Sequence, residues 1–239
     1  MRIRLPGVLV AVSLSGAAGW AQEFALIDDF DRPDTLYHGH HWETLNPGYW
    51  KIQDNALRRR LQNVGNRNPI TSFPFHWSSG GKEIEPRPGD RTPNLPMGMI
   101  WRRDWTLTGN YTVRATFTVR DLSPEGRGEQ DGYMGVCFGG ESLYESRNFR
   151  GGRPGAGSWM ALWHKDGTFG LYDHASGGKA LGEAAPIAGP QLKPGDEVQI
   201  EVEVGGDAAA AVTARVRHGS GVETVTVSDV DRALYTDGY

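Results

Sequence analysis

Carboxylates that alternate along the chain are the first residues with the right type and spacing for catalysis. Glycoside hydrolysis uses two of them, and in retaining enzymes the two carboxyl groups lie roughly 5–5.5 Å apart. Glu201 and Glu203 have the spacing of one strand face, but Glu197 and Gln199 continue that face. A solvated sheet face is therefore the better interpretation of this pair.

Two further carboxylate pairs lie in segments without a strand pattern. Glu83 and Glu85 fall in a proline-rich stretch, and Glu141 and Glu145 fall in a glycine-rich one. Loops positioned by a rigid scaffold often carry catalytic residues. Hydrolysis through Glu141 or Glu145 is therefore kept as an alternative function. Neither a serine nucleophile elbow nor a phosphate-binding P-loop occurs in the sequence.

Aromatic residues provide a second kind of chemistry, which is the binding of sugar rings. Indole rings stack on sugars, and planar polar side chains hydrogen-bond the hydroxyl groups around them. Seven of the eight tryptophans follow residue 21, and Trp101, Arg103 and Trp105 share one strand face. The alternative is that these tryptophans fill the core. The predicted ligand-binding residues are Trp101, Arg103, Tyr133, Glu141, Tyr144, Arg147, Asn148, Trp159 and Trp163.

Histidines and the lone cysteine give weaker signals. His38, His40 and His41 carry imidazoles that suit a transition metal, but no cysteine or carboxylate stands at ligand spacing. A surface loop explains them better. Cys137 is the only cysteine, so an internal disulfide is excluded. Its apolar neighbours predict a buried structural thiol and not a nucleophile.

Period-two alternation is the strongest structural signal. Between residues 111 and 120, apolar or small side chains occupy the odd positions and polar ones the even positions. Such alternation is typical of a strand with one buried and one solvated face. The sequence therefore predicts an all-β sandwich or barrel. We expect strands at residues 25–30, 49–53, 56–62, 98–105, 111–120, 132–138, 158–164, 168–172, 197–204, 212–217 and 222–227.

The first 21 residues have the features of a secretory leader. Two arginines precede an apolar run at residues 5–18, and small residues at 19 and 21 suit cleavage after Ala21. The run is too short to span a bilayer, and no later segment is apolar enough to do so. We expect a secreted or periplasmic protein whose mature part spans residues 22–239. A buried N-terminal strand is the alternative for this segment.

Charge and length limit the class of protein. Loss of Arg2 and Arg4 with the leader leaves 23 basic and 29 acidic residues, a formal charge of −6. This balance argues against nucleic acid as a partner, because neutralising phosphates needs a basic surface. About 218 mature residues suit one large β domain.

Two long segments and the C-terminal residues lack a strand pattern. Residues 63–95 are rich in proline, and residues 139–157 are rich in glycine. Long loops in compact domains are usually functional or disordered, and we expect residues 139–157 to form the rim of a ligand site. Residues 229–239 resemble a connection that leads into a further strand. We therefore expect the natural polypeptide to continue past Tyr239; the alternative is that Tyr239 is a true terminus and these residues fray.

The order of these patterns resembles a known family. Asp28, Asp29 and Phe30 open the mature part, a Tyr-Trp-Lys-Ile-Gln strand and a hairpin follow, and Leu-Lys-Pro-Gly-Asp at 192–196 introduces an alternating strand. Together with Ile100-Trp101, Gly-Tyr-Met-Gly at 132–135 and Trp-Met-Ala-Leu-Trp at 159–163, this resembles the concanavalin A-like jelly roll of lectin, laminin-G-like and glucanase domains. The resemblance covers nearly all of the mature part. It implies two antiparallel sheets.

A looser resemblance concerns larger proteins. The chain is also similar to N-terminal modules of large secreted bacterial hydrolases, including phosphoesterases of the alkaline phosphatase D type. That resemblance implies a catalytic domain after Tyr239, and none of its metal ligands can be assigned here.

The jelly-roll resemblance also implies a calcium site. Lectins of this fold hold the ion with carboxylate and carbonyl oxygens. Asp28 and Asp29 are the predicted ligands, with Asp31 in the same segment. The alternative is that they only cap an edge strand.

We expect a secreted non-catalytic module that binds a glycan or accompanies a downstream catalytic domain. The alternatives are a glycan-acting hydrolase and a purely structural domain of a secreted phosphoesterase. The sequence identifies no cofactor other than the possible calcium ion.

Overall fold

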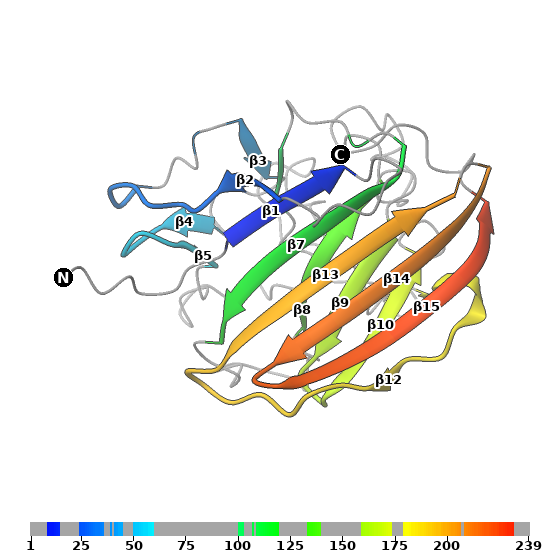
Figure 1. The fold of residues 1–239 in the computed structure, drawn as a ribbon. Coiled ribbons are helices and arrows are strands. Elements are labelled where there is room, and N and C mark those ends of the chain that lie inside the picture. Colours follow the sequence, from blue (N-terminus) through cyan, green and yellow to red (C-terminus); the bar gives the residue numbers. More distant parts are fainter. Residues whose placement is uncertain are drawn as a thin grey trace, which may run out of the picture.

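The computed structural model describes residues 9–14, 24–35, 39, 41–44, 50–59, 100–102, 107, 109–119, 133–139, 159–173, 179–206 and 208–231. These residues form an all-β sandwich of two antiparallel sheets, with two short two-stranded sheets beside it (Figure 1). The predicted fold class is thereby confirmed.

The larger sheet has six strands in the order β15-β14-β13-β7-β1-β2. Alternating sequence accounts for its central strands, because each buries every second side chain. Its strands are β1 (Leu9–Leu14), β2 (Ala25–Asp28), β7 (Tyr111–Thr118), β13 (Glu197–Gly205), β14 (Ala209–His218) and β15 (Gly221–Asp231).

The second sheet lies behind the first in Figure 1 and has the order β11-β10-β9-β8, with β12 also pairing with β10. Its strands are β8 (Tyr133–Phe138), β9 (Trp159–His164), β10 (Thr168–Asp173), β11 (Lys179–Ala180) and β12 (Ile187–Ala188). A single 3-10 turn, η3 (Leu181–Glu183), follows β11.

Two small two-stranded sheets complete the described part of the chain. They pair β3 (Trp42–Thr44) with β6 (Ile100–Arg102), and β4 (Trp50–Ile52) with β5 (Leu57–Arg59). Asp54 and Asn55 form the turn between β4 and β5, and both have positive φ angles, of 53° and 55°. Asp and Asn tolerate this region better than most residues, so these two residues can close the hairpin that was expected after the Tyr-Trp-Lys-Ile-Gln strand.

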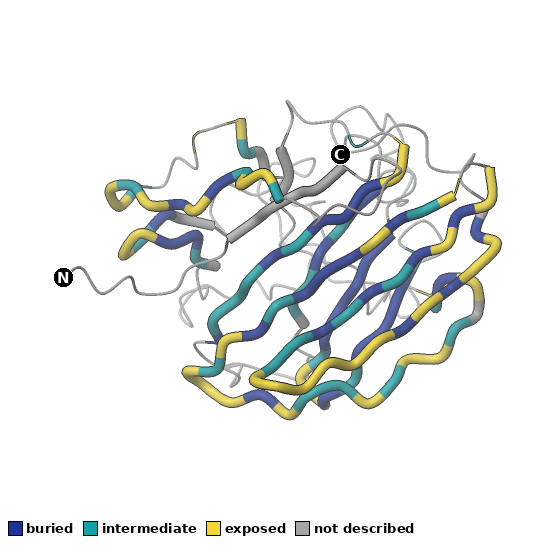
Figure 2. The backbone as a smooth tube through the Cα atoms, viewed as in Figure 1, coloured by how far each residue is buried: buried dark blue, intermediate teal, exposed yellow. Residues whose placement is uncertain are grey.

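The main core lies between the two large sheets (Figure 2). β13 and β14 contribute alternating valines, isoleucine and alanines, while β9 and β10 contribute larger side chains such as Trp159, Phe169 and Leu171. A smaller cluster of Phe30, Ile52 and Leu57 joins β2 to the β4–β5 pair. The main core contains side chains from both large sheets and so joins them.

The N-terminal segment takes a position that its leader-like composition did not predict. Leu9–Leu14 forms β1, which pairs along six residues with β7 and along three with β2. An N-terminal strand was the alternative to a leader for this segment. β3, β11 and β12 were not predicted either, and β11 and β12 have only two residues each, too few to show a period.

Candidate functional site

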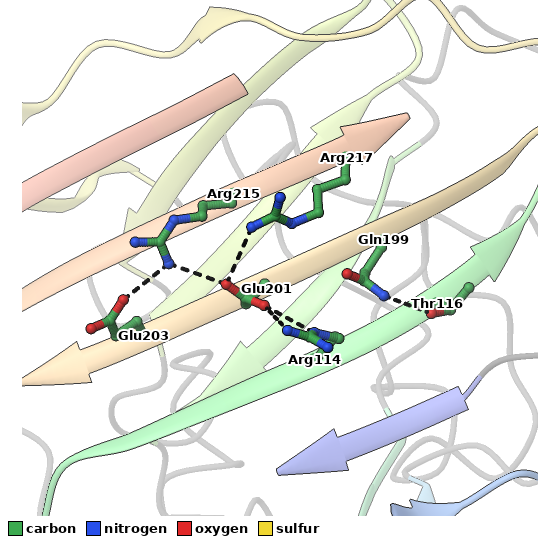
Figure 3. Close-up of polar contacts among 7 residues, drawn as sticks. All are labelled: Arg114, Thr116, Gln199, Glu201, Glu203, Arg215 and Arg217. Atoms are coloured by element: carbon green, nitrogen blue, oxygen red, sulfur yellow. Dashed lines mark hydrogen bonds and ion pairs between the residues drawn. The ribbon is translucent and has the colours of Figure 1, made fainter. Parts of the chain in front are cut away.

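The outer face of the six-stranded sheet carries the largest group of interacting polar side chains among the described residues. Figure 3 shows them on neighbouring strands β7, β13 and β14. We call this group the polar stripe, and its members are Arg114, Thr116, Gln199, Glu201, Glu203, Arg215 and Arg217.

Strand register explains why these residues meet. Arg114 on β7 lies opposite Glu201 on β13, and Glu201 lies opposite Arg215 on β14. Directly opposite residues of antiparallel strands have side chains on the same face, about 4.5–5.5 Å apart at Cβ. On each strand, the residues directly before and after a stripe residue point into the core. The polar stripe therefore lies on the outer face of the sheet.

Glu201 is the centre of the stripe. Its Oε2 accepts hydrogen bonds from Nε of Arg114 at 2.9 Å and from Nη2 of the same side chain at 2.5 Å. Its Oε1 accepts from Nη1 of Arg215 at 3.2 Å and lies 3.8 Å from Nη2 of Arg217. Three guanidinium groups thus surround one carboxylate whose side chain is only 8 % exposed.

Glu203 and Gln199 extend the stripe in both directions. Oε2 of Glu203 accepts from Nη1 of Arg215 at 3.0 Å, and Nε2 of Gln199 donates to Oγ1 of Thr116 at 3.5 Å. Each arginine or amide therefore has a side-chain partner that limits its rotamers. This fixed arrangement of donors and acceptors is what a polar ligand would meet on the sheet.

One aromatic ring borders the stripe. The guanidinium carbon of Arg114 lies 3.7 Å from the centroid of the Phe24 ring. A cation within about 6 Å of a ring face is attracted by the ring quadrupole. Arg114 is thus held from two sides, by Phe24 and by Glu201.

The structure places Trp159 and Trp163 in the core between the sheets, at 1 % and 2 % exposure. The Nε1 of Trp163 donates to the carbonyl of Pro190 at 2.8 Å, and the Trp159 ring meets Phe138 edge-on at 5.9 Å. Neither ring can stack on a sugar from solvent. The core alternative for these two tryptophans is therefore the one observed.

The other predicted ligand-binding residues are described only by their backbone or not at all. Trp101 belongs to β6, where it lies opposite Glu43, and Tyr133 belongs to β8, where it lies opposite His164. Outside the described residues lie Arg103, Glu141, Tyr144, Arg147 and Asn148, together with Glu145. Their predicted role in ligand binding stays a prediction.

Asp28, one of the two predicted calcium ligands, is surrounded by hydrogen-bond donors. Its Oδ1 accepts from the backbone N–H of Phe30 and from Nη1 of Arg32, and its Oδ2 accepts from Nε1 of Trp42, each at 2.8 Å. Burial by itself raises the pKa of this carboxyl. The bonds from Arg32, Phe30 and Trp42 outweigh burial, so the pKa lies below its ordinary value.

These contacts give the segment a structural explanation. Oδ1 of Asp29 accepts from the backbone N–H of Asp31 at 3.0 Å, which is a local turn. Asp28 also forms an ion pair with Arg32 at 2.8 Å, and the role of Asp28 and Asp29 as calcium ligands stays a prediction. Across the described ranges, no three His, Cys, Asp or Glu side chains are grouped to hold a metal.

Cys137 lies on the face of β8 that points away from the main core, next to a cluster of Met160, Leu162 and Tyr172. Burial raises the pKa of its thiol to about 12. A thiol that stays protonated near neutral pH is a poor nucleophile, as the apolar neighbours predicted.

His38 and His40 fall outside the described residues, while His41 is exposed and adopts a positive φ of 62°. The three histidines therefore give no metal centre to describe.

Sequence reasoning missed the arginines of the stripe. Arg114, Arg215 and Arg217 occupy solvent-side positions of alternating strands, so they read as ordinary polar residues. The signal that could have identified them is the alternation within each strand, which places all three arginines on its outer face. They share that face with Glu201 once the register is known. Only strand pairing supplies that register.

Comparisons with known proteins give no relative. No protein-family model, curated protein or solved structure matches this chain. Within the described part of the chain, no helix has the length and apolar character needed to cross a membrane.

Proposed function

We propose that this chain is a secreted, non-catalytic β-sandwich module of the concanavalin A-like type that binds a glycan on the outer face of its larger sheet. The observation that supports this most directly is the polar stripe. Its guanidinium, carboxylate and amide groups are held by one another across β7, β13 and β14. Fixed planar donors and acceptors are what the ring hydroxyls of a sugar require.

The chemistry of the stripe favours binding over catalysis. A glycosidase needs one carboxylic acid able to give a proton to the leaving group and a second carboxylate for the other role. Both oxygens of Glu201 already accept hydrogen bonds from arginines, and Glu203 is bonded to Arg215. Both carboxylates therefore serve as acceptors for arginines of the sheet face.

Phe24 and the exposed threonines support the same conclusion. The ring of Phe24 lies at the β7 side of the stripe against Arg114. Thr213 and Thr226 pair through their hydroxyls at 3.1 Å on the β15 side. A ligand lying across the strands would meet hydroxyls at one end and an aromatic ring at the other.

A glycan array tests this proposal on the exported protein. We expect one glycan class to bind, and we expect Arg215→Ala and Gln199→Ala each to weaken that binding about tenfold, the usual cost of losing one or two hydrogen bonds to a ligand. Glu223→Gln is the matched control, because this exposed carboxylate lies on the neighbouring strand outside the stripe. Circular dichroism must show that all variants stay folded.

Two results would contradict the proposal. Binding that is unchanged in Arg215→Ala and Gln199→Ala would move the site elsewhere on the molecule. Absence of binding to every class of glycan on the array would leave the module with an accessory role beside another domain.

A further inference from the structure

Arg217 is the arginine of the polar stripe whose cross-strand neighbours carry no charge. It lies on β14 between Gln199 on β13 and Val222 on β15. Arg215, two residues earlier on the same strand, instead lies opposite Glu201. Directly opposite residues are the ones whose side chains lie closest on a sheet face. Strand register therefore supplies Arg215 with a carboxylate and leaves Arg217 without one.

The contacts of the Arg217 guanidinium group agree with this position. Among the described residues, its ion-pair partner is Glu201, whose Oε1 lies 3.8 Å from Nη2 (Figure 3). That distance is too long for a hydrogen bond, and the same oxygen already accepts one from Arg215 at 3.2 Å. Arg217 is also the most exposed of the three arginines, with 40 % of its side chain open to solvent. Its donors are therefore available to a ligand.

The stripe as a whole carries excess positive charge. It holds three arginines and two glutamates, a formal charge of +1, in a chain whose formal charge is −4. An arginine fork matches the two oxygens of a carboxylate and donates charge-assisted hydrogen bonds, which are roughly twice as strong as neutral ones. The oxygens of a sulfate ester suit the same fork. Excess positive charge at an accessible guanidinium group thus favours an acidic sugar over a neutral one.

We propose that the glycan bound by the polar stripe is acidic, and that Arg217 receives a carboxylate or sulfate group of one of its sugars. The inference rests on the proposed function, because it takes the stripe as the glycan site and adds the chemical class of the glycan. Gln199 lies directly opposite Arg217, where its amide can bond a hydroxyl of the same sugar. The two side chains then read different features of the ligand.

One exposed carboxylate works against such a ligand. Glu197 lies two residues before Gln199 on β13, on the same outer face, since Val198 between them is buried. Its position is diagonal to Arg217, about 7–8 Å away. Glu197 repels an acidic sugar and has no such effect on a neutral one. Its removal therefore provides a charge test of opposite sign to the removal of Arg217.

Paired probes with and without acidic groups test the inference on the purified chain. The pairs are oligogalacturonate with its methyl ester, and dextran sulfate with plain dextran of the same length. We expect the acidic member of one pair to bind at least about tenfold more tightly than its neutral partner, because it alone forms charge-assisted bonds. The pair that shows the preference identifies the group as a carboxylate or a sulfate. Isothermal titration calorimetry measures each dissociation constant.

Three variants assign the preference to Arg217. Arg217→Ala should weaken binding of the acidic member about tenfold or more and remove the preference, whereas Gln199→Ala should weaken both members alike. Glu197→Gln should tighten binding of the acidic member about twofold. Lys165→Ala is the control for the loss of one positive charge and should change neither member, because this exposed lysine lies in the turn between β9 and β10 of the second sheet.

Two results would overturn the inference and leave the glycan site in place. One is equal binding of the acidic and neutral members in both pairs. The other is a preference for the acidic member that persists in Arg217→Ala. Silence of all four probes also overturns the inference, and the glycan array, measured separately, shows whether the proposed function is wrong as well.

Discussion

Glu201 shows how a single carboxylate on a sheet face can organise its surroundings. Its side chain is 8 % exposed, whereas the side chains of Arg114 and Arg215 are 30 % and 27 % exposed. Solvent therefore screens the arginines more than the carboxylate. Exposed ion pairs contribute little, but a buried charge that loses its partners is costly.

Replacing Glu201 tests this asymmetry. We expect Glu201→Gln to lower the free energy of unfolding by about 1–2 kcal/mol, less than for a fully buried pair because water reaches the arginines. Glu203→Gln is the control, since that side chain is 51 % exposed, and it should cost less than about 0.5 kcal/mol. Urea denaturation at pH 7 measures both. Equal losses in the two variants would show that the burial of Glu201 adds nothing.

Asp28 is the residue that should respond to acid. Its pKa is lowered in the folded protein, so its contribution to stability is present above the ordinary carboxyl pKa of about 3.9 and is lost as pH falls through the lower folded value. We expect Asp28→Asn to cost about 1–3 kcal/mol at pH 7, because donors from Arg32 and Trp42 lose a charged acceptor. The loss should shrink below pH 4.

Asp31→Asn is the matched control for this pH profile, since Asp31 is exposed on the same segment. The free energy of unfolding is followed by urea titration between pH 2.5 and pH 7. A difference between wild type and Asp28→Asn that stays constant over this range would mean that the carboxylate is not stabilised by its donors.

At the scale of elements, the pairing of strands requires glycine at positions where a larger side chain would clash. Gly135 on β8 faces Leu162 on β9, and a Cβ at this position would lie 1.9 Å from the carbonyl oxygen of Ala161. The atom in the way is backbone, which cannot rotate aside. Gly205 at the end of β13 is the opposite case, because no heavy atom lies within 4 Å of its Cβ position.

These two glycines form a matched pair for mutagenesis. We expect Gly135→Ala to lower the free energy of unfolding by about 2–3 kcal/mol, because β8 and β9 must separate to admit the methyl group. Gly205→Ala should change it by less than about 0.5 kcal/mol. Thermal denaturation followed by circular dichroism compares them. A Gly135→Ala protein as stable as wild type would mean that the β8–β9 pairing differs from the one described.

At the scale of the whole molecule, one core holds both large sheets together. Leu171 from β10 and Val202 from β13 are completely buried in the same cluster, although they belong to different sheets. If the two sheets separated, the apolar inner face of each would be exposed to water. We therefore expect the described domain to unfold as one cooperative unit.

Leu171→Ala tests this cooperativity. It should cost about 3 kcal/mol, through lost burial and the cavity left behind, while Val222→Ala, at an exposed valine, should cost less than about 0.5 kcal/mol. Circular dichroism and tryptophan fluorescence should give the same midpoint in each variant. Two separate transitions in Leu171→Ala would show that the sheets unfold independently.

The sequence by itself determined the long strands at the centre of the larger sheet. Alternation over residues 111–120, 197–204 and 212–217 predicted β7, β13 and β14, because the side-chain period of a strand is set by its own backbone. The hairpin expected after residues 49–53 is also local, because Asp54 and Asn55 tolerate the positive φ angles that close it. Parity also placed Glu201 on the outer face of β13, although it identified neither the burial of this carboxylate nor its arginine partners.

Only the tertiary structure decided which residues meet. Trp159 and Trp163 alternate as a ligand-binding face would, and pairing between sheets was needed to show that this face is the core. Asp28 meets Trp42, and Glu201 meets Arg114 from 87 positions away. Leu9–Leu14 enters the sheet beside β7. These outcomes depend on register and strand order, which long-range packing sets and which no local period contains.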